Sequence, residues 1–238
     1  MDSPRILPLA VTNLGMSVQG IDILRGVSFA MDSGSRTVIL GPNGAGKSVL
    51  LRLLHGLLVP SAGRVEWSSA DTTRVRRAQA FVFQRPVMLR RSAADNIAFA
   101  LRVAGAAHPD EDAQRALAEA GLAHLAARPA RLCSGGEQQR IALARAGALA
   151  PEVLFLDEPA ANLDPAATRA IEERLMALHA GGITLVMTTH DLAAARRLAT
   201  RVLFLHQGRL MEDSPAEAFF SQPRSPEAAA FLRGELLC

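Results

Sequence analysis

One stretch of eight residues, 41–48, constrains this chain more than any other: Gly-Pro-Asn-Gly-Ala-Gly-Lys-Ser. It matches G-x-x-x-x-G-K-S/T at every fixed position. An apolar run, 37–40, precedes it, and a second apolar run, 49–54, follows it and ends at Gly56. A buried strand, a glycine-rich loop and a helix in this order are the context in which such a loop binds phosphate. The sequence therefore predicts an α/β fold built around a phosphate-binding loop.

The residue types inside this loop suit that chemistry. Its glycines let the backbone wrap closely and point successive N–H groups inward, at the positive end of the helix dipole. Lys47 can reach the terminal phosphates as a point charge, and the Ser48 hydroxyl is placed to ligate Mg²⁺. A glycine-rich turn that merely contains Lys-Ser is the alternative, which the flanking strand and helix disfavour. We expect ATP to be bound by Gly41, Pro42, Asn43, Gly44, Ala45, Gly46, Lys47, Ser48 and Val49.

Length and composition exclude several classes of protein. The 238 residues suit one large α/β domain or a core with a modest insertion. No uncharged apolar run is long enough to span a membrane, and residues 1–4 lack the basic start of a secretory signal, so we expect a cytoplasmic protein. Cys133 and Cys238 cannot form a disulfide framework and lack metal-ligand spacing. The net charge of +3, without basic runs interleaved with aromatics, gives no indication of nucleic acid as a partner.

The character of the sequence changes twice along the chain. Turn-punctuated apolar runs between residues 9 and 40 predict an antiparallel β-region. From 86 to about 147, Ala, Leu and Arg recur at helical spacing, and an α/β alternation resumes at Val153. We expect a single domain over 1–238, with an ATP-binding α/β core at 1–84 and 148–212, an α-helical subdomain at 85–147 and a C-terminal helical tail at 213–238.

A second motif, at residues 153–158, consists of four apolar residues followed by two carboxylates. On a buried parallel strand this order places Asp157 at the carboxyl end of the sheet, beside the phosphate loop. There Asp157 can hold Mg²⁺ directly or through water, and Glu158 can polarise the attacking water as a general base. Such a strand end is a weak signal alone, but it becomes a strong one when a phosphate loop precedes it in the chain.

A third motif, at residues 133–140, is Cys-Ser-Gly-Gly-Glu-Gln-Gln-Arg. It opens an apolar-periodic helix, so that backbone N–H groups and the Ser134 hydroxyl would face an anion. It resembles the signature L-S-G-G-Q followed by Q-Q-R of the ATP-binding subunits of ABC transporters, with Cys133 for Leu and Glu137 for Gln. With the two other motifs, the resemblance covers nearly the whole chain. It implies a P-loop NTPase (RecA-like) core with an N-terminal antiparallel β-subdomain and an inserted α-helical subdomain.

The resemblance also implies how the nucleotide site is assembled. Two copies of the chain would sandwich two ATP molecules, and the signature of each would cap the γ-phosphate held by the other. Gln84, ending a strand at 81–84, matches a glutamine that contacts Mg²⁺ or water, and Asp164 matches a loop that crosses the dimer interface. His190 matches a histidine that contacts the γ-phosphate. The implied catalytic residues are Glu158, His190 and Gln84, the metal ligands Ser48, Gln84 and Asp157, and the further nucleotide contacts Ser134, Gly135, Gly136, Glu137 and Asp164.

The chain departs from the family pattern at two positions. The family usually places an aromatic residue upstream of the phosphate loop, where it stacks on adenine, and the aligned residue here is Val18. Because stacking is worth about 1–3 kcal/mol, we expect nucleotide affinity and adenine selectivity to be roughly tenfold or more weaker. Cys133 is expected to replace leucine by packing as a small hydrophobe, and a redox role is disfavoured because a buried thiol is inert.

The function implied by the resemblance is a Mg²⁺-dependent ATPase that dimerises around two ATP and powers a membrane ABC transporter. We expect it at the cytoplasmic face of the inner membrane, bound to integral membrane permease subunits and served by a solute-binding protein, as in prokaryotic importers. Residues 85–92 look like those of ATPases from tungstate or related oxyanion importers. The alternatives are an exporter ATPase, a soluble ABC ATPase of DNA repair or translation, and a module in which ATP only regulates dimerisation. Glu158 and His190 argue against the last.

Overall fold

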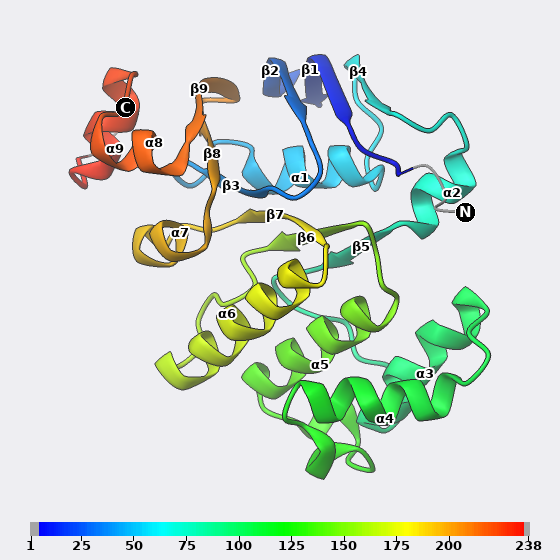
Figure 1. The fold of residues 1–238 in the computed structure, drawn as a ribbon. Helices are drawn as coiled ribbons and strands as arrows, with labels where there is room; N and C mark the ends of the chain where they lie inside the picture. Colours follow the sequence, from blue (N-terminus) through cyan, green and yellow to red (C-terminus); the bar gives the residue numbers. More distant parts are fainter. Residues whose placement is uncertain (1–4, 236–238) are drawn as a thin grey trace. The chain divides into compact units, whose positions relative to one another are not determined.

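The computed structural model describes residues 5–235 of the chain (Figure 1). The fold divides into two compact units, one made of residues 1–76 and 184–238 and the other of residues 77–183. Expectations that concern residues 1–4 and Cys238 lie outside the described residues. Among residues 5–235, no helix has the length and apolar character that crossing a membrane requires.

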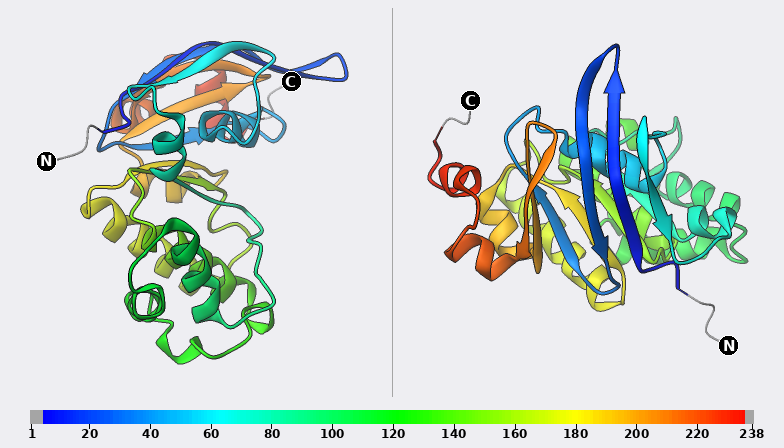
Figure 2. Two further views of the ribbon diagram at one scale, coloured as in Figure 1. Left: turned by 90° about the vertical axis from the view of Figure 1, so that its right-hand side faces the viewer. Right: turned by 90° about the horizontal axis from the view of Figure 1, so that it is seen from above.

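A three-stranded antiparallel sheet, ordered β2-β1-β4, begins the first unit. The strands β1 (Leu9–Val18) and β2 (Ile21–Met31) form a hairpin, and β4 (Ala62–Trp67) pairs with the other edge of β1. Figure 2 shows the three strands side by side in one layer. Both hairpin strands are longer than the short apolar runs in the sequence, because buried apolar residues alternate with exposed ones along them.

The second sheet of this unit is mixed. It has the order β7-β3-β8-β9, in which β3 (Arg36–Leu40) pairs in parallel with β7 (Thr184–Thr188) and β8 (Arg201–His206), and β9 (Arg209–Pro215) is antiparallel to β8. The central strand β3 is buried along almost its whole length, as its continuous apolar sequence predicts. The helix α1 (Lys47–His55) contacts both β2 and β7 and so lies between the two sheets.

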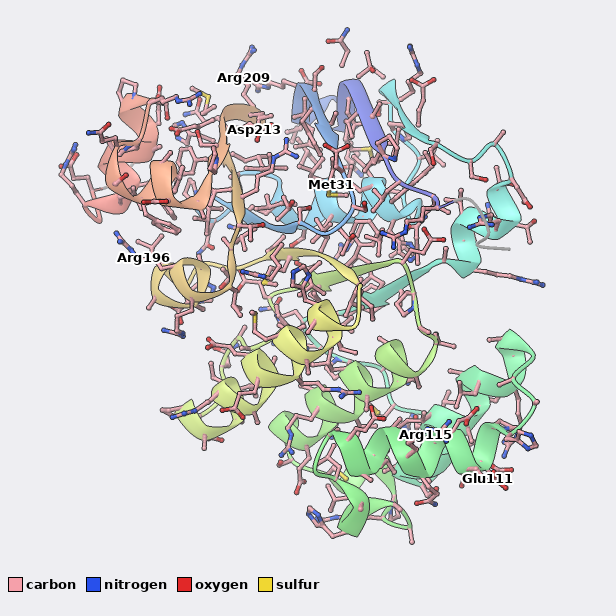
Figure 3. The ribbon with its side chains drawn as sticks, in the orientation of Figure 1. Met31, Glu111, Arg115, Arg196, Arg209 and Asp213 are labelled. Atoms are coloured by element: carbon pink, nitrogen blue, oxygen red, sulfur yellow. The ribbon has the colours of Figure 1, made fainter. Side chains whose placement is uncertain are left out.

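The last helices of this unit pack on the second sheet. Phe204 of β8 contacts the rings of Phe219 and Phe231, with centroids 5.8 Å and 5.2 Å away. Arg196, labelled in Figure 3, lies over the ring of Phe220, 4.7 Å from its centroid. These contacts attach the tail to the sheet through aromatic surfaces. The helices concerned are α7 (Leu192–Leu198), α8 (Ala216–Ser221) and α9 (Pro226–Leu232).

The second unit combines one pair of parallel strands, β5 (Gln79–Val82) and β6 (Val153–Asp157), with a group of helices. The helix α5 (Gly135–Ala148) is central to that group, because it contacts α3, α4, α6 and β5. Its residues from Ile141 to Ala144 are buried for this reason. The other helices are α3 (Ala93–Ala104), α4 (Pro109–Glu119) and α6 (Pro165–Ala180), while α2 (Thr72–Arg77) spans the boundary between the units.

The predicted fold class is confirmed, and the differences are local. The structure places α3 and α4 within residues 85–147, where an α-helical subdomain is expected, and α5 ends one residue beyond that range. The exact bounds of the subdomain stay a prediction. Within the stretch of helical spacing, residues 122–127 contain only a short 3-10 turn, Ala123–Leu125. The expected strand at 81–84 is found two residues earlier, at Gln79–Val82, so Gln84 lies in the loop beyond the strand and does not end it. Pairing with β6 stops at Val82, and the Phe83 carbonyl accepts a side-chain hydrogen bond in place of a ladder bond.

Candidate functional site

The glycine-rich loop connects β3 to α1, and its glycines are sterically required. Gly41, Gly44 and Gly46 all have positive φ angles, of 149°, 80° and 98°. A Cβ atom on Gly41 would lie 2.1 Å from the Leu205 carbonyl oxygen, and one on Gly46 would lie 2.7 Å from Leu24 Cδ2. Close approach of the backbone to its neighbours and left-handed conformations therefore exclude other residues at these positions.

Lys47, the single lysine of the chain, lies folded against the same loop. Its side chain is only 7% exposed, and Nζ donates hydrogen bonds to the carbonyl oxygens of Gly41 (2.7 Å) and Pro42 (3.0 Å). The first turn of α1 contains no acidic residue that would oppose an anion. An ammonium, a hydroxyl at Ser48 and the amides at a helix N-terminus form a donor set that fits a polyphosphate with its metal ion.

His190 lies at the same edge of the sheet as this loop. In the parallel pair of β3 and β7, Ile39 is opposite Thr188. Gly41 and His190 each come two residues after a member of this pair, so they follow the two strands at equivalent positions. His190 is exposed. The structure therefore brings together the two predicted contacts to phosphate that belong to the first unit.

Val18 occupies the tip of the β1–β2 hairpin, opposite Ile21. Both side chains face solvent, with exposed fractions of 44% and 70%. Residues 9–28 contain no aromatic residue, and the whole chain contains no tyrosine. The weaker affinity that we expect from this composition stays a prediction.

In the second unit, the predicted site residues Asp157, Glu158 and Gln84 lie at the carboxyl ends of two paired strands. Asp157 is the last residue of β6 and is 3% exposed. Because Val82 is opposite Leu156 in the parallel pair, Gln84 and Glu158 lie at equivalent positions just beyond the two strands. Glu158 has a φ of 50°, a left-handed conformation that costs a non-glycine residue about 1–3 kcal/mol. Such a conformation persists only where the surrounding structure imposes it, and it is concentrated at functional sites.

The signature motif forms the start of α5. The Ser134 hydroxyl accepts a hydrogen bond from the Glu137 amide (3.3 Å), and the Glu137 carboxylate accepts one from the Ser134 amide (2.7 Å). This capping box lowers the pKa of Glu137, mainly through the hydrogen bond from the Ser134 backbone. The amides of Gly135 and Gly136 belong to the first turn, which has no intrahelical acceptor, and they can face a ligand.

Asp164 caps the neighbouring helix in the same way. Its carboxylate accepts a hydrogen bond from the Ala167 amide (2.9 Å) at the start of α6. A Cβ atom on Gly136 would lie 3.1 Å from Ala167 Cβ, so the N-termini of α5 and α6 are side by side. The structure thus brings the signature and Asp164 together, although a contact of either with nucleotide stays a prediction.

Cys133 packs as expected. Its side chain is 6% exposed, and burial, followed by the charge of Glu137, raises the pKa of the thiol. The thiol therefore stays protonated at neutral pH and acts as a small apolar side chain.

Sequence reasoning did not single out two buried polar residues of the second unit, Asn96 and Gln139. Asn96 is fully buried in α3 and bonds to the backbone of Leu89, Arg91 and Ser92. Gln139 lies on α5 and donates to the Phe83 carbonyl oxygen (3.2 Å). The available signal is an amide on the apolar side of a helix, which indicates a buried partner. The residues three and four positions further along are Phe99 and Ala100 for Asn96, and Ala142 and Leu143 for Gln139.

Comparison with known proteins agrees with this geometry. Residues 24–161 match the family described as ABC transporter. The phosphate import ATP-binding protein PstB 2 of Natronomonas pharaonis is 36% identical, with 96% of this chain and 87% of the relative covered. The tungstate uptake system ATP-binding protein TupC of Peptoclostridium acidaminophilum is 37% identical, with 90% and 100% covered. A dimeric ATP-binding cassette solved with ADP and phosphate superposes with a TM-score of 0.79 at 28% identity, with 87% and 98% covered.

The family match spans more than half of the chain, and the relatives align along nearly all of it. The phosphate loop, the acidic strand end and the signature at residues 133–140 all lie within the matched range. This chain belongs to the ABC transporter family, as one of its ATP-binding subunits with ATPase activity.

Proposed function

We propose that this ATPase powers the import of an oxyanion, as a subunit bound to a membrane permease on its cytoplasmic face. The observation that carries the catalytic part is the pairing of buried Asp157 with left-handed Glu158, in register with Gln84. The cargo rests on similarity to phosphate and tungstate import subunits over at least 90% of this chain.

The phosphate loop binds the nucleotide. The amides around Gly44 and Gly46 surround the phosphates, and Lys47, already held against the loop, adds a positive charge. Ser48, Asp157 and Gln84 would hold Mg²⁺, which supplies charge neutralisation at the terminal phosphates when bound. The hydroxyl, carboxylate and amide oxygens of these residues are hard ligands of the kind that Mg²⁺ prefers.

Glu158 acts as the general base. Its carboxylate orients a water molecule towards the γ-phosphorus and accepts a proton from it as the bond to phosphate forms. His190 donates a hydrogen bond to the γ-phosphate and stabilises the charge that develops there. As this bond forms, the bond between the γ-phosphorus and the β–γ bridging oxygen breaks, and ADP leaves with that oxygen.

Each site is completed by a second copy of the chain. The adjacent N-termini of α5 and α6 present the amides of Gly135 and Gly136 next to Asp164, a surface suited to the γ-phosphate of another copy. The dimeric relative with ADP and phosphate supports this arrangement. ATP then favours the closed dimer because it binds both copies only in that state, and hydrolysis reverses the preference.

Permease subunits and a solute-binding protein complete the transporter. The loop at 85–92 suits the permease contact, because the exposed Val87 lies between the basic residues Arg85 and Arg90.

Purification of the membrane complex, followed by identification of its subunits and uptake assays in proteoliposomes, tests which solute is transported. ATP-dependent uptake of tungstate or phosphate supports the proposal, whereas uptake of methionine alone contradicts it.

The catalytic assignment is tested by Glu158→Gln. We expect phosphate release to fall by about 10²- to 10⁴-fold, the usual contribution of a general base, while ATP binding remains. The control is Glu173→Gln, which removes a solvent-exposed carboxylate from α6 and is expected to leave turnover unchanged. Normal phosphate release by the Glu158 variant would overturn the assignment.

A further inference from the structure

The irregular segment after β5 is held in place by side chains. Three polar side chains donate to its backbone carbonyl oxygens: Gln139 Nε2 to Phe83 (3.2 Å), Arg145 Nη1 to Val87 (3.1 Å) and Arg131 Nε to Met88 (2.9 Å). A loop carbonyl has no ladder partner, so each of these donors fixes the position of one peptide group. Gln139 and Arg145 both come from α5.

Of the three donors, Gln139 binds the carbonyl group nearest to Gln84 in the sequence. Its side chain is only 3% exposed, and a buried amide must be paired or it destabilises the fold. The peptide group that it holds immediately precedes Gln84. On the other side, Gln139 is five residues from Ser134, the N-cap of the same helix. A single rigid helix thus carries both the signature and the donor that fixes the start of the Gln84 loop.

We propose that Gln139 is a positioning residue for Gln84, and that α5 and the loop at 83–88 move as one body. This inference rests on the proposed role of Gln84 in the nucleotide site. Displacement of the signature end of α5 would then be transmitted to Gln84 through the Phe83 carbonyl. Arg145 strengthens the same attachment one turn and a half further along the helix.

A double-mutant cycle distinguishes positioning from simple packing. The four proteins are wild type, Gln84→Ala, Gln139→Met and the double variant; methionine keeps the volume of glutamine but removes the donor. We expect Gln139→Met alone to lower kcat about 3- to 10-fold, the equivalent of one hydrogen bond, with KM for ATP unchanged. In the Gln84→Ala background, the same change should lower kcat no further.

A purely structural Gln139 predicts a different result. The two effects on kcat would multiply in the double variant, and that outcome overturns the proposal, as does an unchanged kcat in Gln139→Met alone. The matched control is Gln138→Met, one residue away, whose amide donates to the Cys133 carbonyl (2.8 Å) and not to the loop. Its effect should multiply with that of Gln84→Ala.

A replacement variant and a comparison with the Glu158 variant complete the test. Should Gln139→Met not fold, as judged from its thermal unfolding midpoint, Arg145→Met removes the contact to Val87 and takes its place in the cycle. Failure of the inference is separable from failure of the proposed function. If wild type releases phosphate and Glu158→Gln does not, the function stands, and multiplying effects in the cycle refute only the role of Gln139.

Discussion

Val18 ends β1 with 44% of its surface exposed, at the position where the resemblance to the family predicts an aromatic ring. A valine covers little of a nucleotide base and offers no π-face to it. The hairpin tip is open enough to accept a larger side chain, because Ile21 opposite is still more exposed. We therefore predict that nucleotide binding by this chain depends mainly on contacts to the phosphates.

We predict that Val18→Tyr tightens ATP binding by about 5- to 100-fold, because base–aromatic stacking is worth about 1–3 kcal/mol. Isothermal titration of both proteins measures the change in Kd. Ile21→Tyr is the control, since it adds the same ring to the same hairpin tip at the cross-strand position. Equal Kd values for wild type and Val18→Tyr would contradict either the alignment or the stacking argument.

Some features of individual residues can be predicted from the sequence, and others cannot. Gly41 and Gly46 follow from the spacing of the phosphate-loop motif, and their positive φ angles and close neighbours disfavour any other residue type. The left-handed conformation of Glu158 has no signal in the sequence, because it is imposed by its surroundings. The hydrogen-bond partner of Gln139 also could not be predicted from the sequence, because Phe83 is 56 residues away along the chain.

The helix α5 shows what a single element contributes. Its N-terminus is closed by the capping box between Ser134 and Glu137, which combines a helix cap with a carboxylate at the positive end of the dipole. The family signature that this segment resembles has glutamine at the position of Glu137. A glutamine can keep the hydrogen bond from the Ser134 amide but loses the charge, so the two residues differ mainly in their response to pH.

We predict that Glu137→Gln lowers the free energy of unfolding at pH 7 by a few tenths of a kcal/mol, because the carboxylate is largely solvent-screened. The pKa of Glu137 is lower in the folded state than in the unfolded state. Its contribution is therefore fully present above the ordinary glutamate value of about 4.3 and is lost as the pH falls through the folded value. Urea unfolding at pH 7 and at pH 3 measures the difference between wild type and variant.

That difference should be smaller at pH 3 than at pH 7, because the charge-dependent contribution is lost as the carboxyl becomes protonated. A Glu137→Gln difference that grew on acidification would contradict the sign of the pKa shift.

The whole molecule is incomplete as one copy in the proposed function. The phosphate loop with His190 belongs to one unit of the chain, and the signature with Asp164 belongs to the other. The proposed pairing combines the loop of one copy with the signature of the next, in a symmetric dimer with two equivalent sites. Two inactive variants, one altered in the phosphate loop and the other in the signature, should then recover activity when they are mixed.

We predict that Ser134→Arg and Lys47→Ala are each inactive alone, because each variant spoils both sites of its own dimer. Mixed in equal amounts, they should recover about a quarter of wild-type turnover, since half of the dimers are mixed and each has one intact site. Phosphate release from the mixture measures the recovery. A mixture that stayed inactive would contradict the shared site, and so would full activity of Ser134→Arg alone.

Local physics explains which features could be read from the sequence of this protein. The phosphate loop, the acidic strand end and the capped helix are continuous stretches whose chemistry is complete within a few residues. The fold class could therefore be predicted from them, and the resemblance of residues 133–140 to a known signature indicated the family. The tertiary structure decided the long hairpin, the end of β5 two residues early and the attachment of the Gln84 loop to α5. These features join residues that are distant in the chain, and burial and hydrogen-bond partners at such distances are created only when the chain folds.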